Sequence, residues 1–225
     1  MSLVPLGLAL WLVQSAPQAG APAAAPRTAP ATAPTAAARP KAPEGLSWED
    51  ADQVAETVAR LERRLKAGKP ASREPITVSE RQVNSYVALA LGSKLPASVS
   101  GLSFRFEPER LAASGMLDLD AVKEKLPKTG ASTLLSFLGG TVPVTVKGRF
   151  QGVSGQGQVV VEEAAVNGIS LPPSVLAQIV AQATRSSKQP AGFDLLAPFP
   201  LPWTARSVRL EAGRAVVEFA QEAAR

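Results

Sequence analysis

The most regular pattern in this chain is an alternation of apolar and polar residues over positions 141–153. The even positions are apolar or glycine, whereas most odd positions are polar or charged. A period of two over this length predicts a β-strand with one buried face, and Pro143 is expected near a strand start or edge. The dipeptide Ser154-Gly155 predicts a tight turn, and the β-branched run 156–166 predicts the returning strand.

Three glycines lie on this predicted hairpin, at positions 148, 152 and 157. A glycine removes a side chain, which lets a long sheet curl or lets another group approach the backbone closely. We expect these missing side chains to favour an apolar cavity beside the hairpin. The apolar run 174–184 follows two prolines that suit a first helical turn, so it predicts a helix packed against the hairpin.

Two further hairpins show the same alternation. Residues 102–107 and 111–119 flank a Pro-Glu-Arg turn, and residues 208–210 and 215–219 flank an Ala-Gly turn. The three hairpins predict about six main antiparallel strands. A short strand is also expected at residues 76–78.

Two helices with capping boxes are predicted before these hairpins. Ser47 and Asp50 suggest a box that opens a helix to residue 66, with an apolar stripe on one side. Ser79 and Gln82 suggest a second box, opening a helix to about residue 91. Asn84, early on that helix, is interpreted as a surface or capping residue.

Two segments do not fit a regular pattern. Residues 123–140 predict a short helix or a flap between strands. Residues 191–203 gather six large apolar side chains among three prolines, which excludes a regular strand or helix. This stretch either caps the core or lines the mouth of an apolar cavity, and the two roles are compatible.

The N-terminal region differs from the rest in composition. Residues 1–20 contain an apolar run at 3–13, which is too short to span a bilayer but suits a signal peptide; a short membrane anchor is the alternative. Residues 21–45 are rich in Ala and Pro and predict a disordered linker, either a tether or a compositionally drifted leader. A single domain is expected at 46–222, in an exported protein of the periplasm or cell envelope.

Composition narrows the possible chemistry. The chain has no His and no Cys, which excludes catalytic triads, thiolate or imidazole metal sites and disulfides. The net charge of +5 is too diffuse to indicate nucleic acid binding. A basic cluster on the first helix either contacts an anionic membrane surface or is simply solvated; it comprises Arg60, Arg63, Arg64, Lys66 and Lys69.

A search for catalytic motifs returns nothing. There is no Ser-x-x-Lys, no Gly-x-Ser-x-Gly, no Walker loop and no Gly-x-Gly-x-x-Gly. Acidic pairs occur at 49–50, at 162–163 and at positions 118 and 120, and a solvated edge explains them more simply than a glycosidase pair. We therefore expect no enzyme activity, no cofactor and no metal.

The order of elements resembles a known superfamily. A helix beginning "ITVSERQVNSYVALAL" is followed by the hairpin "LSFRFEPERLAASGMLDL", by "NGISLPPSVL" and by a closing "PLPW…VRLEAGRAVVEF". Across residues 76–219 this pattern is similar to bacterial TULIP-like (tubular lipid-binding) proteins, relatives of bactericidal/permeability-increasing and lipid-transfer proteins. The resemblance implies an α+β fold with a long, strongly curved antiparallel sheet wrapped around one or more helices. It also implies an apolar groove for acyl chains and no catalytic residues.

Two function classes follow. The first is binding or transport of a lipid or another apolar ligand in the envelope; the second is a structural or protein-interaction module whose core is closed. A residual cavity would separate them, because a filled core binds nothing. The expected wall of the groove comprises Phe104, Phe106, Leu117, Leu119, Val144, Val146, Phe150, Leu176, Ile179 and Val180, with Phe199 and Trp203 near its mouth.

Overall fold

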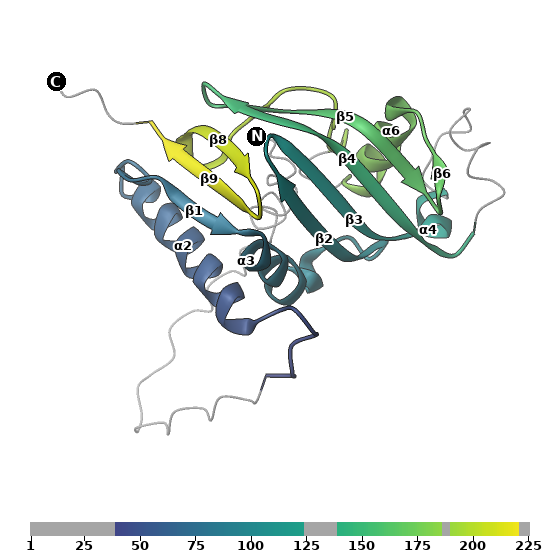
Figure 1. The fold of residues 1–225 in the computed structure, drawn as a ribbon, viewed down its shortest axis with the longest axis horizontal. Helices are drawn as coiled ribbons and strands as arrows, with labels where there is room; N and C mark the ends of the chain where they lie inside the picture. The colour runs from purple at the N-terminus through teal and green to yellow at the C-terminus, as the bar shows by residue number, and fades with distance from the viewer. Residues whose placement is uncertain (1–38, 124–138, 186–189, 221–225) are drawn as a thin grey trace, which may run out of the picture.

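A computed structural model describes residues 39–123, 139–185 and 190–220 of the 225-residue chain (Figure 1). The described residues form one nine-stranded antiparallel sheet and four α-helices. The α+β class and the antiparallel sheet are thereby confirmed. The apolar run at 3–13, most of the Ala/Pro-rich segment and most of the charged segment after residue 123 lie outside the described residues.

The three predicted hairpins are all present. They are β2 (Val99–Glu107) with β3 (Arg110–Asp118), β4 (Thr141–Val153) with β5 (Gln156–Val166), and β8 (Ala205–Glu211) with β9 (Arg214–Phe219). The sheet exceeds six strands because three short ones join it: β1 (Ile76–Ser79), β6 (Ile169–Ser170) and β7 (Phe199–Pro200). Pro143 lies third in β4, one residue outside the β4–β5 register, as expected.

The helices lie at two places along the sheet. They are α2 (Trp48–Lys66), α3 (Glu80–Ser85), α4 (Leu119–Lys123) and α6 (Pro173–Ala183). In Figure 1, α2 and α3 lie near β1 and β9, whereas α6 lies behind β4 and β5. No helix in the described ranges is both long and apolar enough to cross a membrane.

Strand β4 connects the two parts of the sheet. It pairs with β5 along one edge and with β3 along the other, and beyond the end of β3 it pairs with β8 through Gly152 and Val208. A Cβ at Gly152 would lie 2.8 Å from the carbonyl oxygen of Val208. The backbone of β8 can therefore approach β4 only because position 152 has no side chain.

The turn of the β2–β3 hairpin completes this junction. The Glu109 N–H donates to the Leu210 carbonyl at 3.1 Å, and the Phe150 N–H donates to the Glu109 carbonyl at 2.9 Å. The Gly213 N–H donates to the Phe106 carbonyl at 3.0 Å. The turns of these two hairpins therefore satisfy each other's backbone groups. They do so beside the single residue pair that joins β4 to β8.

A β-bulge interrupts the β4–β5 hairpin. Lys147 pairs with Glu163 and Gly148 with Val161, so Glu162 is the extra residue. The bulge reverses the alternation of β5, which therefore turns both Glu162 and Glu163 towards solvent. The acidic pair that interrupts the strand pattern in the sequence is thus accommodated without burying a charge.

The edge strand β2 is protected by side chains of α3. Asn84 accepts a hydrogen bond from the Phe104 N–H at 2.7 Å and donates to the Phe104 carbonyl at 2.8 Å. The Glu80 carboxylate accepts from the Phe106 N–H at 2.7 Å. These side chains occupy the place of a neighbouring strand, so the interpretation of Asn84 as a surface or capping residue is wrong.

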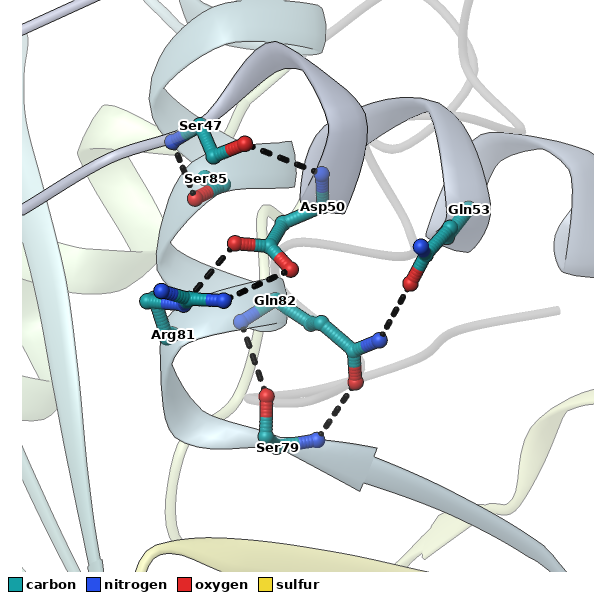
Figure 2. A network of polar contacts seen from close by, with 7 residues as sticks. All are labelled: Ser47, Asp50, Gln53, Ser79, Arg81, Gln82 and Ser85. Carbon is teal, nitrogen blue, oxygen red and sulfur yellow. Dashed lines mark hydrogen bonds and ion pairs between the residues drawn. The ribbon is translucent and has the colours of Figure 1, made fainter.

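The first capping box is only half formed (Figure 2). The Ser47 hydroxyl accepts from the Asp50 N–H at 3.4 Å, as predicted. The Asp50 carboxylate, however, forms an ion pair with Arg81 at 2.9 Å, and the Ser47 N–H donates instead to the Ser85 hydroxyl at 3.0 Å. The start of α2 is therefore held by α3.

The second capping box forms fully. The Ser79 N–H donates to Gln82 Oε1 at 2.9 Å, and the Gln82 N–H donates to the Ser79 hydroxyl at 3.2 Å (Figure 2). Gln82 also donates to Gln53 of α2 at 2.8 Å. The predicted helix to about residue 91 is present, but its hydrogen bonding changes along its length, because α3 continues directly into a π-helical turn, Tyr86–Ala90.

We predict that Gly152→Ala destabilises the fold by about 1–3 kcal/mol, because its Cβ would collide with the backbone of β8. Chemical denaturation measures the change in the free energy of unfolding. Gly92→Ala is the matched control, since nothing lies within 4 Å of a Cβ there and its φ is not left-handed. Equal stability of the two variants would contradict the role given to Gly152.

Asn84→Ala is expected to cost about 1–3 kcal/mol, because it leaves the Phe104 N–H and carbonyl without partners. Hydrogen exchange should accelerate at the Phe104 amide before other amides of β2. Gln151→Ala, on the exposed face of β4, should change stability by less than about 0.5 kcal/mol. Unchanged exchange at Phe104 would show that Asn84 does not protect the edge.

Candidate functional site

Two apolar cavities adjoin the inner face of the sheet, and we name them A and B. Cavity A, of about 70 Å³, lies between α2, the turn after α3 and the strands β1, β8 and β9; its wall includes Val54, Val58, Tyr86, Phe150, Trp203 and Phe219. Cavity B, of about 160 Å³, lies between β2–β5 and α6; its wall includes Phe104, Leu117, Val144, Val146, Leu176, Ile179 and Val180.

The twelve residues predicted to wall one groove are divided between these cavities. Seven of them line cavity B, and they are the seven named for it above. Phe150, Phe199 and Trp203 line cavity A instead. Phe106 and Leu119 are buried in the core and line neither cavity. The face predicted from the alternation therefore points inwards, but it does not enclose a single space.

The cavities meet at a cross-strand pair. Phe150 of β4 lines cavity A, and its register partner Val159 of β5 lines cavity B. Phe199 packs edge-to-face against Phe193, with ring centroids 6.1 Å apart. The expected groove wall on this hairpin is therefore divided between two cavities.

The three hairpin glycines do not create open space. A Cβ at Gly148 would lie 2.4 Å from the Val160 carbonyl oxygen, and one at Gly157 would lie 2.5 Å from the Phe199 ring. Gly152, as described above, admits β8. The protein's own atoms therefore occupy the room beside Gly152 and Gly157, as the expectation of a cavity there did not foresee, whereas Gly148 does form part of the wall of cavity B.

Small residues of β3, together with Gly148 of β4, shape cavity B. Ala113 and Gly115 are part of its wall, on the face that the alternation of β3 turns inwards. Val54 and Val58 of α2, which wall cavity A, belong to the predicted apolar stripe of that helix but were not predicted as site residues. Their heptad-like spacing was the available signal, although it does not distinguish core from cavity wall.

Segment 191–203 is not wholly irregular, because it contains the two-residue strand β7 and leads into a 3₁₀ turn at Pro202–Thr204; the exclusion of a regular strand was wrong there. The segment lines both cavities. Phe193, Leu195, Phe199 and Leu201 are buried, as a cap over the core requires. Leu195 also lines cavity B, whereas Phe199, Leu201 and Trp203 line cavity A. The capping role and the cavity-lining role therefore coexist.

Thr184, which lines cavity B, has a hydroxyl group that is already hydrogen-bonded within the protein. The Thr184 hydroxyl donates to the Val180 carbonyl at 2.7 Å and accepts from the Phe193 N–H, also at 2.7 Å. The Ser114 hydroxyl lies 2.8 Å from that of Ser103 on the exposed side of the sheet. An occupant of cavity B would therefore meet apolar surface.

The acidic pairs have structural partners. Arg149 donates to Glu162 at 2.7 Å, and Lys147 pairs with Glu163 at 2.8 Å. The hydrogen bond from Arg149 holds the pKa of Glu162 below its usual value, with a further contribution from the charge of Arg110. Asp118 accepts hydrogen bonds from two N–H groups at the start of α4. No cluster of three or more carboxylates that could hold a metal occurs within the described part of the chain.

Two members of the basic cluster on and just after α2 form hydrogen bonds within the protein. The Arg63 guanidinium donates to the Ala59 carbonyl at 3.2 Å, and that of Arg64 donates to the Pro70 carbonyl at 2.8 Å. Arg60, Lys66 and Lys69 are exposed. These three remain available for an anionic surface.

Comparison of the chain with family models, curated proteins and solved structures found no match.

Tyr86 titrates abnormally in the wall of cavity A. Burial, with a smaller contribution from the charge of Glu62, raises the pKa of Tyr86 to about 12 from an ordinary value of 10.0. A raised folded-state pKa means that the neutral phenol stabilises the fold below pH 10 and that this contribution is lost as the pH rises towards 12.

Because Tyr86 is the single tyrosine, absorbance titration reports it directly. We predict a midpoint near 12 in the folded protein, a midpoint near 10 after unfolding in denaturant, and a lower folded midpoint in Glu62→Gln. Circular dichroism at each pH shows whether the chain is still folded. A folded chain titrating near 10 would contradict the burial of the phenol.

Proposed function

We propose that this protein binds an apolar ligand, or the apolar part of a lipid, in cavity B without catalysing a reaction. The observation that carries the proposal is a space of about 160 Å³ whose wall is almost entirely apolar side chains from four strands and α6. Such a space favours an apolar occupant, because water in it would lack hydrogen-bond partners.

The volume limits the size of the ligand. An engineered apolar cavity of about 150 Å³ stays dry and binds benzene, whereas pockets for drug-sized ligands occupy roughly 300–1,000 Å³. Cavity B therefore accommodates a small apolar molecule or the end of a chain. Burial contributes about 0.8 kcal/mol for each methylene, so tight binding of a longer chain requires apolar contacts outside this cavity. Val99 and Leu102, half-buried on the edge strand β2, belong to the wall of cavity B itself.

The wider context of the proposal is the cell envelope. The resemblance to TULIP-like proteins and the apolar N-terminal run support a lipid-handling protein that is exported, with the sheet curving around its helices. The exposed cations Arg60, Lys66 and Lys69 would place such a protein against anionic headgroups. Nucleic acid is not among the proposed partners.

A structural module with a closed core is the second candidate. It is favoured by the three glycines, beside which a Cβ would meet the protein's own atoms, and by the edge-to-face packing of Phe193 and Phe199. In that case cavity B is a packing defect, and no ligand accompanies the purified protein.

The substitution Val146→Trp distinguishes these candidates. Val146 is half-buried in the wall of cavity B, so an indole there should fill the space. We expect a nearly unchanged melting temperature and loss of uptake of a fluorescent fatty acid. In a closed core the same change would overpack the interior and cost about 1–3 kcal/mol.

Val160→Trp is the matched control, because Val160 lies on the opposite face of the hairpin and is 45% exposed. This variant should retain both stability and uptake. Native mass spectrometry with lipid extraction tests the parent protein. The proposal fails if the parent takes up no probe and yields no extractable apolar ligand.

A further inference from the structure

The short turn between β7 and β8 contains two consecutive residues in the left-handed backbone conformation. Trp203 has a φ of 50° and Thr204 a φ of 57°. This conformation is unfavourable for any residue other than glycine, and most unfavourable for bulky or β-branched side chains. The other described non-glycine residues with positive φ occur one at each of three hairpin turns, and they are Glu109, Ser154 and Asn167. Strain is therefore concentrated at the turn before β8.

The same turn also buries a hydrogen-bond donor without a partner. Trp203 Nε1 finds no acceptor in the described part of the chain. By contrast, the indole of Trp48 donates to the Pro40 carbonyl at 2.8 Å. A buried donor without an acceptor is costly, and each such group in a folded protein calls for an explanation. The observed conformation of Trp203 thus carries two separate costs.

The sheet fixes both ends of this turn. The Leu201 N–H donates to the Gly155 carbonyl at 2.8 Å, and the Ala220 N–H donates to the Thr204 carbonyl at 3.3 Å. Within the turn, the Thr204 hydroxyl donates to the Trp203 carbonyl at 2.5 Å. Strained backbone persists only where the surrounding structure holds it, and such segments are suited to switching between two conformations. Here the strain is confined to the residues between two anchored ends.

The turn lies between cavity A and solvent. Pro202 and Trp203 line cavity A and are half-buried, whereas Thr204 is exposed. A ring that borders a cavity makes fewer dispersion contacts than a ring in a close-packed core. Less packing therefore opposes a movement of the Trp203 indole away from this wall.

We propose that Pro202–Thr204 is a lid on cavity A with a second, open conformation. In the open conformation the indole leaves the wall, Nε1 donates to water, and Trp203 and Thr204 leave the left-handed region. These changes offset the loss of the buried contacts of the indole, so the open conformation is a populated minor state. Opening connects cavity A with solvent, and closing seals it. This lid goes beyond the proposed function and does not depend on what occupies cavity B.

The direct test is hydrogen exchange of the Trp203 indole N–H in the full-length parent protein, followed by ¹H–¹⁵N NMR. Loss of the signal in Trp203→Phe assigns it. The Val217 amide is the reference for global unfolding, because β9 is paired with β1 on one side and with β8 on the other. We expect the indole to exchange through local opening, with a protection factor at least about tenfold below that of Val217.

The denaturant dependence of exchange distinguishes local opening from unfolding. Exchange of the indole should depend little on denaturant, because opening a turn of three residues exposes little surface. The Val217 amide should show the full dependence of global unfolding. If both protons exchange only through global unfolding, the lid is overturned.

Replacement of Thr204 tests whether backbone strain drives the opening. Thr204→Gly removes the Cβ that makes a positive φ unfavourable, which stabilises the closed conformation. Exchange of the Trp203 indole should then slow about tenfold. Thr204→Asn should act in the same direction with less added flexibility, since Asn tolerates the left-handed region. Thr204→Val keeps the β-branch and removes only the hydroxyl, so it should not slow exchange.

Glu109→Gly is the matched control, because it relieves a positive φ of 60° at another hairpin turn. It should leave exchange of the Trp203 indole unchanged. Slower exchange in Thr204→Gly or Thr204→Asn, but not in Glu109→Gly, supports the lid. Slowing in neither variant, or equal slowing in Glu109→Gly, overturns it. If the Thr204 variants do not fold, exchange in the parent decides. The readout uses no ligand, so its failure is distinct from failure of binding in cavity B.

Discussion

The arrangement of this protein depends on the close approach of β8 to β4 at Gly152. A Cβ at this position would lie 2.8 Å from a backbone oxygen of β8, so any side chain would separate the two strands. On one side of the junction lie β1, β8 and β9 with α2, and on the other lie β2, β3 and β5 with α6, while α3 contacts both α2 and β2 (Figure 1). Cavity A and cavity B occupy these two parts. Their separation follows from the junction and from the Phe150–Val159 pair beside it.

Satisfaction of backbone polar groups explains how the remaining elements are placed. An edge strand needs partners for its outward N–H and C=O groups, and α3 supplies them to β2 through Asn84 and Glu80. The same short helix holds the start of α2 through Ser85 and Arg81. One helix of six residues therefore connects the N-terminal helix to the far edge of the sheet. Its position is fixed by polar contacts as much as by burial of Val83.

The sequence predicts the local structure well and the long-range structure less well. Both strands of the β4–β5 hairpin begin and end where the alternation and its turn indicate, because these signals involve neighbouring residues. The bulge at Glu162, the partner of Asn84 and the use of Gly157 by Phe199 depend on residues distant in sequence, so no local pattern specifies them. For the same reason the apolar face of β4 was predicted correctly, whereas its division between two cavities was not. A strand pattern determines which side chains point inwards, but not what meets them there.

The two cavities have similar apolar walls and differ mainly in volume. Cavity B has an apolar wall, and the hydroxyl of Thr184 is already engaged as both donor and acceptor. Discrimination there rests on size, since an apolar wall distinguishes ligands by only a modest factor for each methylene. The wall of cavity A is also almost entirely apolar, and its volume is less than half that of cavity B. Phe150 and Val159 are register partners that line different cavities, so adjacent positions of one hairpin contribute to two separate spaces.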